Sequence, residues 1–341
     1  MSQAAYPALA LALGSLPVIV LLAFFIALDS YKLVRPRLAL LLVLGGNFAA
    51  LVSLAVNLSL VRGAGLPVGL VAKVIAPVFE ESLKGAFVLY LLRTRRVAFL
   101  VDAAIAGFAV GAGFAAVENV VQFLILPRQT VVLWLIRGCG TAVMHGTVTA
   151  IMAISAIHFR ERSEAPVYLS SLPGWALAAA LHSLYNHFFL APDLTAVLLL
   201  TALPLFFLLL FHLSGKSTRA WLGTGFDTDS ELLALIDSGT VSESRVGNYL
   251  RTLKASFAPT VVADMVCLLR LRSELSIHAK GILLMRQSGF EVPPDPKIGE
   301  RFAELEYLEK SIGPTGLLAL SPICHMSDRD LWQLHMLRGG H

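Results

Sequence analysis

Residues 67–92 read PVGLVAKVIAPVFEESLKGAFVLYLL, and this stretch combines two properties that decide the fold. It is long and apolar enough to cross a bilayer, which takes about 20 residues of helix. Near its middle it nevertheless carries two adjacent carboxylates, Glu80 and Glu81, with Lys84 one helical turn later. A charged side chain at mid-bilayer costs about 2.5–3.5 kcal/mol on insertion scales. The stretch therefore predicts a membrane-spanning helix whose polar residues have a function.

Six further apolar stretches accompany it, near residues 7–28, 38–61, 98–126, 130–158, 173–191 and 194–213. Helices are the economical structure for all seven, because hydrocarbon cannot satisfy exposed backbone groups. Residues 1–213 hold 21 of the Asp, Glu, Lys and Arg side chains, whereas the shorter remainder holds 29. We expect an all-α polytopic membrane helix bundle of about seven transmembrane helices at 1–213, followed by a small soluble helical domain at 214–341.

Lysine and arginine are distributed unequally between the two sets of alternate loops. One set contains Lys32, Arg35, Arg37, Arg93, Arg95, Arg96, Arg160, Arg162, Lys216 and Arg219. The opposite set contains only Arg62 and Arg128. Because cytoplasmic loops are enriched in these residues, we expect the N-terminus outside and the C-terminal domain in the cytoplasm. The same loops explain the pI near 9.0, so the expected partner is the lipid bilayer and not nucleic acid.

Ionisable residues on four of the predicted helices lie at a similar depth. They are Glu80 and Glu81 in 67–92, Glu118 in 98–126, His145 in 130–158 and His182 in 173–191. Polar residues scattered for structural reasons would have no cause to agree in depth. Three other charged residues, Lys73, Asp102 and Arg137, lie nearer the ends of their spans. We expect these three to serve topology or structure.

Helical spacing adds five residues to this set, each beside one of its members or one turn away. Lys84 follows the paired carboxylates and can neutralise them through an i,i+4 contact. The others are Phe114 and Asn119 near Glu118, Thr149 one turn after His145, and Asn186 one turn after His182.

Glutamate, histidine and amide side chains at one depth suit hydrolysis. A carboxylate away from water can act as a general base, and an imidazole can protonate a leaving amine. An amide N–H can stabilise a developing oxyanion. The same residue types also bind zinc, for which Glu118, His145 and His182 are the candidate ligands. A His-Glu-x-x-His motif is absent from the sequence, so both metal-free and zinc chemistry stay open.

In chain order, four motifs resemble those of the PrsW family of intramembrane proteases, which belongs to a superfamily with the CPBP proteins and CaaX-processing endopeptidases. The motifs are Glu80-Glu81-x-x-Lys84, Gly113-Phe114-Ala-x-x-Glu118-Asn119, His145 with Thr149, and His182-x-x-x-Asn186. Together they cover roughly residues 67–190. Lys84 and Glu118 favour PrsW, because the CPBP pattern has an arginine and a histidine in the corresponding motifs.

The resemblance implies proteolysis of a membrane-anchored protein substrate, such as an anti-sigma factor, in a bacterial inner membrane. It implies that Glu80 is the base, with Glu81 and Lys84 setting its charge, while the last motif holds the water and the oxyanion. Members are described as metalloproteases, whereas CaaX relatives resemble glutamate-dependent enzymes; we favour a glutamate-activated water, with zinc as the alternative. The implied catalytic residues are Glu80, Glu81, Glu118, His145, His182 and Asn186, supported by Lys84, Phe114, Asn119 and Thr149.

Other functions would use the same polar residues. A proton-coupled transporter would relay protons through them, but it should show inverted repeats or paired broken helices, which the sequence lacks. A non-catalytic scaffold that shields a partner need not keep acid, base and amide groups. A zinc hydrolase acting on lipid amides would need histidines besides His158 near the cytoplasmic helix ends. The sequence assigns neither an oligomeric state nor a role for residues 214–341.

Overall fold

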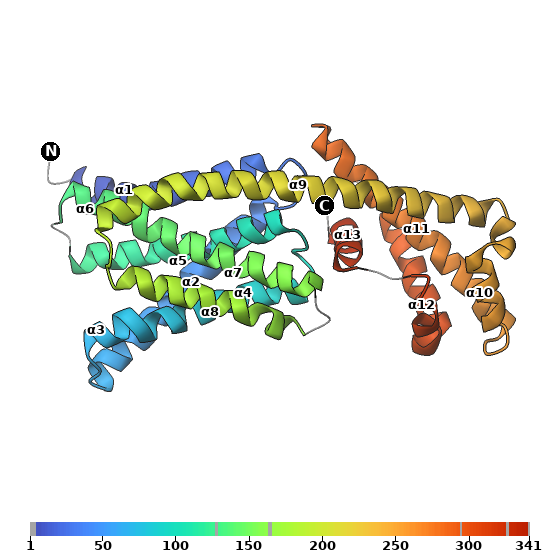
Figure 1. Ribbon diagram of the computed structural model, residues 1–341, viewed down its shortest axis with the longest axis horizontal. Coiled ribbons are helices and arrows are strands. Elements are labelled where there is room, and N and C mark those ends of the chain that lie inside the picture. The colour runs from blue at the N-terminus through green and yellow to red at the C-terminus, as the bar shows by residue number, and fades with distance from the viewer. Residues whose placement is uncertain (1–4, 127–128, 163–165, 294, 325–326, 340–341) are drawn as a thin grey trace. The chain divides into compact units, whose positions relative to one another are not determined.

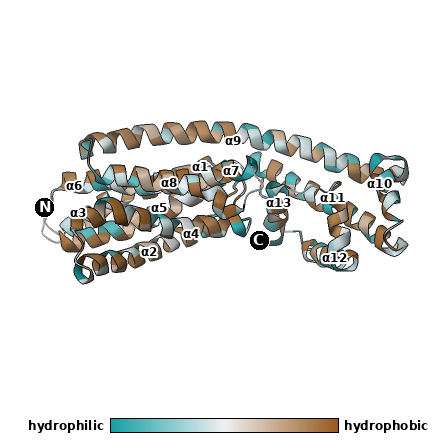
Figure 2. Cartoon of the chain, turned by 60° about the horizontal axis from the view of Figure 1, so that its bottom comes forward, coloured by the Kyte–Doolittle hydropathy of each residue, from teal (hydrophilic) through white to brown (hydrophobic). Residues whose placement is uncertain are grey.

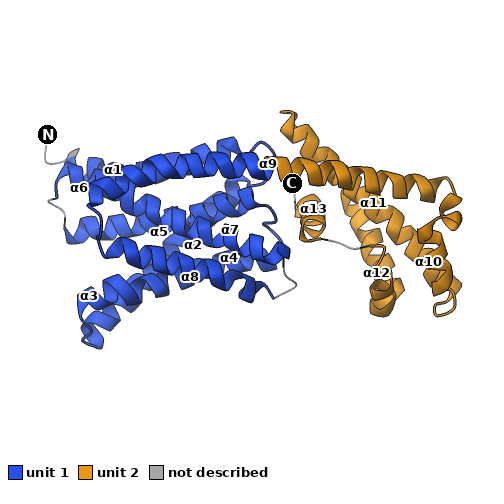
Figure 3. Ribbon diagram, in the orientation of Figure 1, with its two compact units in different colours: residues 1–214 blue, residues 215–341 orange. Residues whose placement is uncertain are grey.

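The computed structural model describes residues 5–126, 129–162, 166–293, 295–324 and 327–339. Within these ranges all regular structure is helical, which confirms the predicted all-α class. The chain divides into two compact units, residues 1–214 and 215–341 (Figure 3). Arg128, one of the two cations expected in loops on the non-cytoplasmic side of the membrane, is not among the described residues.

The first unit is a bundle of long helices that run alongside one another (Figure 1). These are α1 (Ala5–Leu28), α2 (Pro36–Leu58), α4 (Ala76–Arg93), α5 (Leu100–Ile125), α7 (Val143–Arg162), α8 (Val167–Asn186) and the start of α9 (Pro192–Asp237). Two short helices, α3 (Val68–Leu70) and α6 (Val131–Ile136), join them, together with π-helical turns η1 (Ser59–Gly63), η2 (Val71–Ile75) and η3 (Arg137–Ala142).

Five helical segments are long and apolar enough to cross a membrane: Tyr6–Leu28, Pro36–Gly63, Leu100–Ile125, Val131–Arg162 and Pro192–Asp237. The expected number of seven is therefore not confirmed. The two expected spans missing from this set correspond to α4, which holds Glu80, Glu81 and Lys84, and to α8, which holds His182. The two helices whose composition is too polar to qualify as membrane spans, α4 and α8, thus both carry candidate site residues.

Helix α5 is the central helix of the first unit. In its most apolar window 83% of the residues are buried, against 22% in α9. A Cβ atom at Gly111 would collide with the carbonyl oxygen of His145, and one at Gly113 with that of Val43. Small residues let helices approach closely in lipid, so these glycines allow α5 to pack directly against α7 and α2.

Aromatic rings add a second contact layer on the side of α1 and α9. The rings of Phe25 and Phe207 are stacked with their centroids 3.7 Å apart, and Phe108 meets Phe25 edge-on at 5.1 Å. All three side chains are fully buried. In lipid, where no hydrophobic effect drives helices together, this kind of close packing holds the bundle.

The second unit contains the end of α9, then α10 (Arg245–Leu253), α11 (Pro259–Gln287), α12 (Ile298–Leu320) and α13 (Asp328–Gly339). Its helices mix polar and apolar faces, whereas those of the first unit are more uniformly apolar (Figure 2). Leu268 and Leu275 of α11 are fully buried in its core. The sequence predicts a span ending at 213, but α9 continues to Asp237, since no proline follows residue 213 before Gly239 adopts a φ of 72°.

Candidate active site

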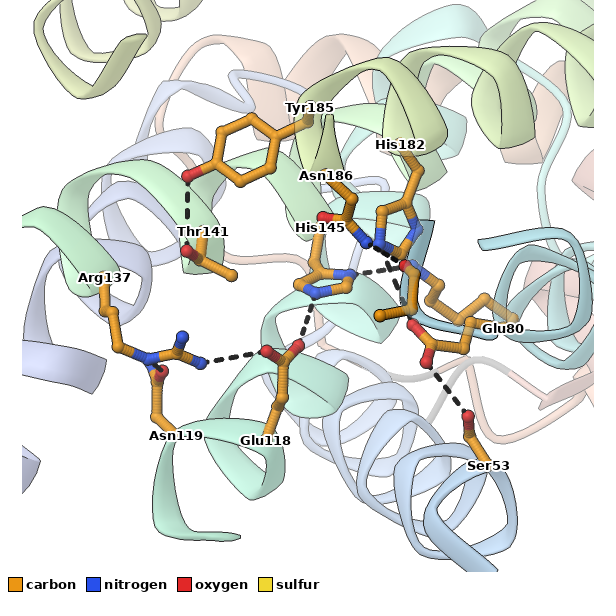
Figure 4. Close-up of polar contacts among 12 residues, drawn as sticks. Ser53, Glu80, Glu118, Asn119, Arg137, Thr141, His145, His182, Tyr185 and Asn186 are labelled. Carbon is orange, nitrogen blue, oxygen red and sulfur yellow. Dashed lines mark hydrogen bonds and ion pairs between the residues drawn. The ribbon is translucent and has the colours of Figure 1, made fainter. Parts of the chain in front are cut away.

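Four helices of the first unit bring ionisable side chains into contact (Figure 4). Helix α4 supplies Glu80, Glu81 and Lys84, and the others are Glu118 on α5, His145 on α7 and His182 on α8. We call these six residues the polar cluster. Four of them are at most 2% exposed, the exceptions being Glu80 and Glu118.

The Glu81 carboxylate is held from two sides. Its Oε1 lies 2.5 Å from Lys84 Nζ and 2.8 Å from His182 Nδ1. The ion pair links residues i and i+3 of α4, and both side chains are fully buried. Removing one partner of such a pair would leave an uncompensated buried charge, which is strongly destabilising. Lys84 therefore compensates the charge of Glu81 and holds its carboxylate in place.

The His145 ring connects the two ends of the polar cluster. Its Nδ1 lies 3.1 Å from Lys84 Nζ, and its Nε2 lies 2.6 Å from Glu118 Oε2. An ammonium group can only donate, so Nδ1 must be the acceptor. The ring proton of a neutral His145 therefore sits on Nε2, which donates to Glu118.

Arg137 completes the outer end of the network, although we expected it to serve topology. Its guanidinium lies 2.9 Å from Glu118 Oε1, and its Nε donates to Asn119 Oδ1 at 2.9 Å. Asn119 in turn donates to the carbonyl oxygen of Gly14 at 2.6 Å. The amide predicted as a possible catalytic support thus connects α5 to α1. The signal for Arg137 was its place one turn before Thr141, on the helical stripe that leads to His145.

Glu80 has neutral partners on α2, a helix in which the sequence predicted no site residue. Ser53 and Asn57 on α2 donate to its Oε1 at 3.1 and 3.2 Å. On its other side, Oε2 lies 3.8 Å from His182 Nε2. A serine and an asparagine one turn apart in an otherwise apolar span were the available signal, because they form one polar face.

One glutamate and two histidines are close enough to share a metal ion. Ligand atoms of Glu80, His145 and His182 all lie within 4.8 Å of one another. One ring nitrogen of each imidazole contacts a carboxylate: His145 Nε2 contacts Glu118, and His182 Nδ1 contacts Glu81. Metal-bound histidines commonly have such a carboxylate on the nitrogen that does not bind the metal. Two histidines and one glutamate are also a known catalytic zinc set. The residues therefore fit zinc, with Glu80 in the place where the sequence suggested Glu118.

The other predicted residues support the polar cluster from its edges. The Phe114 ring packs 5.0 Å from the His145 ring and 4.8 Å from Lys84 Nζ. Thr149 donates to the His145 carbonyl oxygen within α7. Asn186 donates to the carbonyl oxygen of Ala72 at 2.9 Å, which connects the end of α8 to η2. Its amide is thus engaged with backbone and does not bond to the polar cluster.

Asp102 and Lys73, two of the residues expected to serve topology or structure, also have clear positions. Asp102 accepts hydrogen bonds from the backbone N–H groups of Ala98 and Phe99 at 3.0 and 2.8 Å, so it caps the start of α5. This agrees with the structural role expected for it. Lys73 is exposed in η2.

Two of the π-helical turns directly precede helices of the polar cluster. The turn η2 ends five residues before Glu80, where α4 begins, and η3 ends three residues before His145, where α7 begins. π-Helical turns are rare and are frequently found at functional sites. A further contact lies at η3, where Thr141 Oγ1 is 3.2 Å from the hydroxyl of Tyr185, a residue that the sequence analysis did not select.

The fold and the site define a multi-pass helical membrane protein with a buried glutamate–histidine cluster. The family model for PrsW family intramembrane metalloproteases matches residues 35–211, just over half of the chain. The chain belongs to this family, which confirms the resemblance and supports a peptidase in the membrane. No curated protein and no solved structure matches the chain.

Proposed function

We propose that this chain is an intramembrane endopeptidase that hydrolyses a peptide bond in a membrane-anchored protein. The observation that carries the proposal is the triad of Glu80, His145 and His182, whose ligand atoms come from three helices and lie within 4.8 Å. Carboxylates fix both imidazole rings, and fixed groups of this kind are what acid–base and metal-assisted hydrolysis require. A scaffold that only shields a partner would not need them.

The charges of the polar cluster favour a bound cation. Glu81 pairs with Lys84 and Glu118 with Arg137, whereas Glu80 forms no ion pair with lysine or arginine among the described residues. With neutral histidines, one negative charge stays uncompensated. A cation beside Glu80 would remove the cost of that buried charge. We therefore propose zinc held by Glu80, His145 and His182, in place of the metal-free water that the sequence favoured.

Zinc at this position would supply a water nucleophile at neutral pH and polarise the scissile carbonyl. The protein's own residues orient the reaction. Glu81 Oε1 and Glu118 Oε2 fix the His182 and His145 rings. Glu81 Oε2 is buried without a hydrogen-bond partner in the described structure, and we assign to it the proton of the attacking water. That proton then passes to the leaving amine, which completes hydrolysis.

The full chain, purified and reconstituted with a panel of single-span substrates, provides the test. We expect wild type to cleave at least one substrate, and Glu80→Gln and His182→Ala to lose activity. Glu161→Gln, an exposed glutamate at the end of α7, is the matched control and should retain activity. Unchanged cleavage by both cluster variants would refute this site.

The same preparation distinguishes the two mechanisms. We expect a chelator to abolish cleavage, zinc to restore it, and elemental analysis to find about one zinc per wild-type chain. The His182→Ala variant should contain less. Full activity in chelator, with no metal bound, would restore the metal-free water mechanism.

We further propose a bacterial inner-membrane location, a regulatory substrate of the anti-sigma type, and an N-terminus outside the cytoplasm. The ten-to-two distribution of Lys and Arg between alternate loops supports the orientation. A cysteine introduced at Arg62 should react with a membrane-impermeant reagent applied from outside, and one at Lys216 should not. The reverse pattern would invert the topology.

A further inference from the structure

An apolar pocket of about 460 Å³ lies between α7, α8 and the beginning of α9. Ligand pockets typically measure about 300–1,000 Å³. Among its lining residues only Thr147, Tyr185 and Thr195 carry a hydroxyl, and none is charged. Leu184 and Phe188 at its rim are 54% and 61% exposed, so the pocket is open to the surface of the membrane bundle.

The pocket is lined by residues of the same helical turns of α7 and α8 that carry His145 and His182. Met144 and Leu181 line it, and they directly precede His145 and His182 in the chain. Tyr185 lines the pocket, and its hydroxyl lies 3.2 Å from Thr141, one turn before His145. In Figure 4 the Tyr185 ring lies at the edge of the site, on the side of Thr141.

The backbone at the pocket rim is strained. Phe188 has a φ of 53°, in the left-handed region that bulky side chains rarely adopt. Such residues persist only where surrounding structure holds them, and they gather at active sites and ligand clamps. The strain presents an exposed aromatic side chain at the mouth of an apolar cavity, which suits capture of another apolar group.

Resting on the proposed protease function, we propose that this pocket receives a bulky apolar side chain of the substrate's transmembrane segment, within a few residues of the scissile bond. An extended chain advances about 3.3 Å per residue, so a peptide bond at His145 and His182 places its neighbours beside Tyr185. The substrate class is therefore a membrane segment with leucine, methionine or phenylalanine near the cut. A lipid acyl chain would match the walls but has no connection to the reacting groups.

The test measures selectivity in the reconstituted full-length protein. The cleavage site of a single-span substrate is mapped by mass spectrometry, and each flanking residue is then replaced by alanine, leucine or phenylalanine. Thr195→Trp fills the pocket from α9, whereas Leu198→Trp places the same side chain on the exposed face of that helix, outside the pocket. Leu199→Ala enlarges the pocket.

At one flanking position, we expect wild type and Leu198→Trp to prefer leucine or phenylalanine over alanine by about 10-fold or more in kcat/KM, as apolar pockets do. Thr195→Trp should reduce that ratio to near one while cleaving the alanine substrate at the wild-type rate, which shows that the variant is folded. Leu199→Ala should shift the preference toward phenylalanine.

Three results would overturn the inference. Cleavage by wild type with no size preference at any flanking position would exclude the pocket and leave the protease function intact. An unchanged ratio in Thr195→Trp would assign the pocket to lipid. Failure of wild type to cleave any substrate would count against the protease function itself, and the pocket assignment would fall with it.

Discussion

The polar cluster contains two carboxylate–imidazole pairs that have the same chemistry but differ in how much of their side chains is exposed. Glu81 and His182, 2.8 Å apart, are buried together with Lys84, the cation that compensates Glu81. The pair of Glu118 and His145 is equally close, at 2.6 Å, but the Glu118 side chain is 35% exposed. Its compensating cation, Arg137, is 16% exposed and comes from a different segment.

The difference indicates that the two pairs have different roles in the site. The charge of Glu81 is compensated within α4 by Lys84, so this compensation depends little on how the helices move relative to one another. The Glu118 pair joins α5 and α7, its compensating cation lies in η3, and Glu118 is the most exposed side chain of the polar cluster. We infer that water enters at Glu118 and that Glu81 holds the fixed side of the site. The predictions below test this contrast.

The largest expected effect is loss of activity on removal of either histidine. Both rings belong to the triad, so His145→Ala and His182→Ala should each reduce the rate of peptide cleavage by about 10²–10⁴-fold. His187→Ala is the matched control near the same helix end as His182, since the His187 side chain bonds to the Ser183 carbonyl oxygen and stacks on Phe189. If one of these histidine variants retained activity, the carboxylate–imidazole pair to which that histidine belongs would have no part in the mechanism.

The two pairs should differ most in stability. Glu81→Gln leaves the Lys84 charge buried and uncompensated, and should destabilise the fold by about 3–5 kcal/mol. Glu118→Gln breaks a partly exposed pair, so we expect a loss of about 1 kcal/mol or less. Denaturation of the purified protein in mixed detergent measures both. The double variant Glu81→Gln/Lys84→Met should recover most of the loss; no recovery would mean that Lys84 is not the reason for it.

A smaller effect is expected on metal affinity. Carboxylates that orient metal-bound histidines typically contribute 10–100-fold to metal affinity or activity. Glu118→Gln, which should stay folded, is therefore expected to weaken zinc binding by about that factor in competition with a chromophoric chelator. Equal affinity in wild type and variant would confine Glu118 to a structural role.

The smallest effect is predicted for Arg137→Lys. Lysine keeps the charge but cannot contact Glu118 and Asn119 together as the guanidinium does. The loss of about one hydrogen bond, worth about 1 kcal/mol, should lower activity several-fold. Lys73→Arg is the control, because Lys73 is exposed in η2. A loss in Arg137→Lys as large as that in the histidine variants would give Arg137 a direct role in the reaction.

Much of the fold follows from local sequence. Apolar length predicts that residues 38–61 and 98–126 are helices, and α2 and α5 occupy them. Two helices expected to be spans, α4 and α8, do not qualify by composition, because residues such as Glu80 and His182 make them more polar. Length could not locate the end of α9 either, since a helix continues until a residue stops it, here near Gly239.

The site shows the same limit. Spacing within one helix predicts that Lys84 meets the paired carboxylates, and it does so at Glu81. Spacing does not tell which other helix a side chain faces. Asn186 therefore bonds to Ala72 although it shares a helical face with His182, and Arg137 reaches Glu118 although it was expected to serve topology.

The sequence by itself determined that the protein is an all-helical, multi-pass member of a membrane protease family with glutamate and histidine at a common depth. The helical class and the polar residues follow from hydropathy and from spacing along single helices, which are local properties, and the family follows from the resemblance of four motifs. Only the tertiary structure decided that Glu80 joins His145 and His182, because that choice depends on how α4, α7 and α8 pack. Glycines on α5 allow that packing, and their effect appears only when a neighbouring backbone occupies the space they leave.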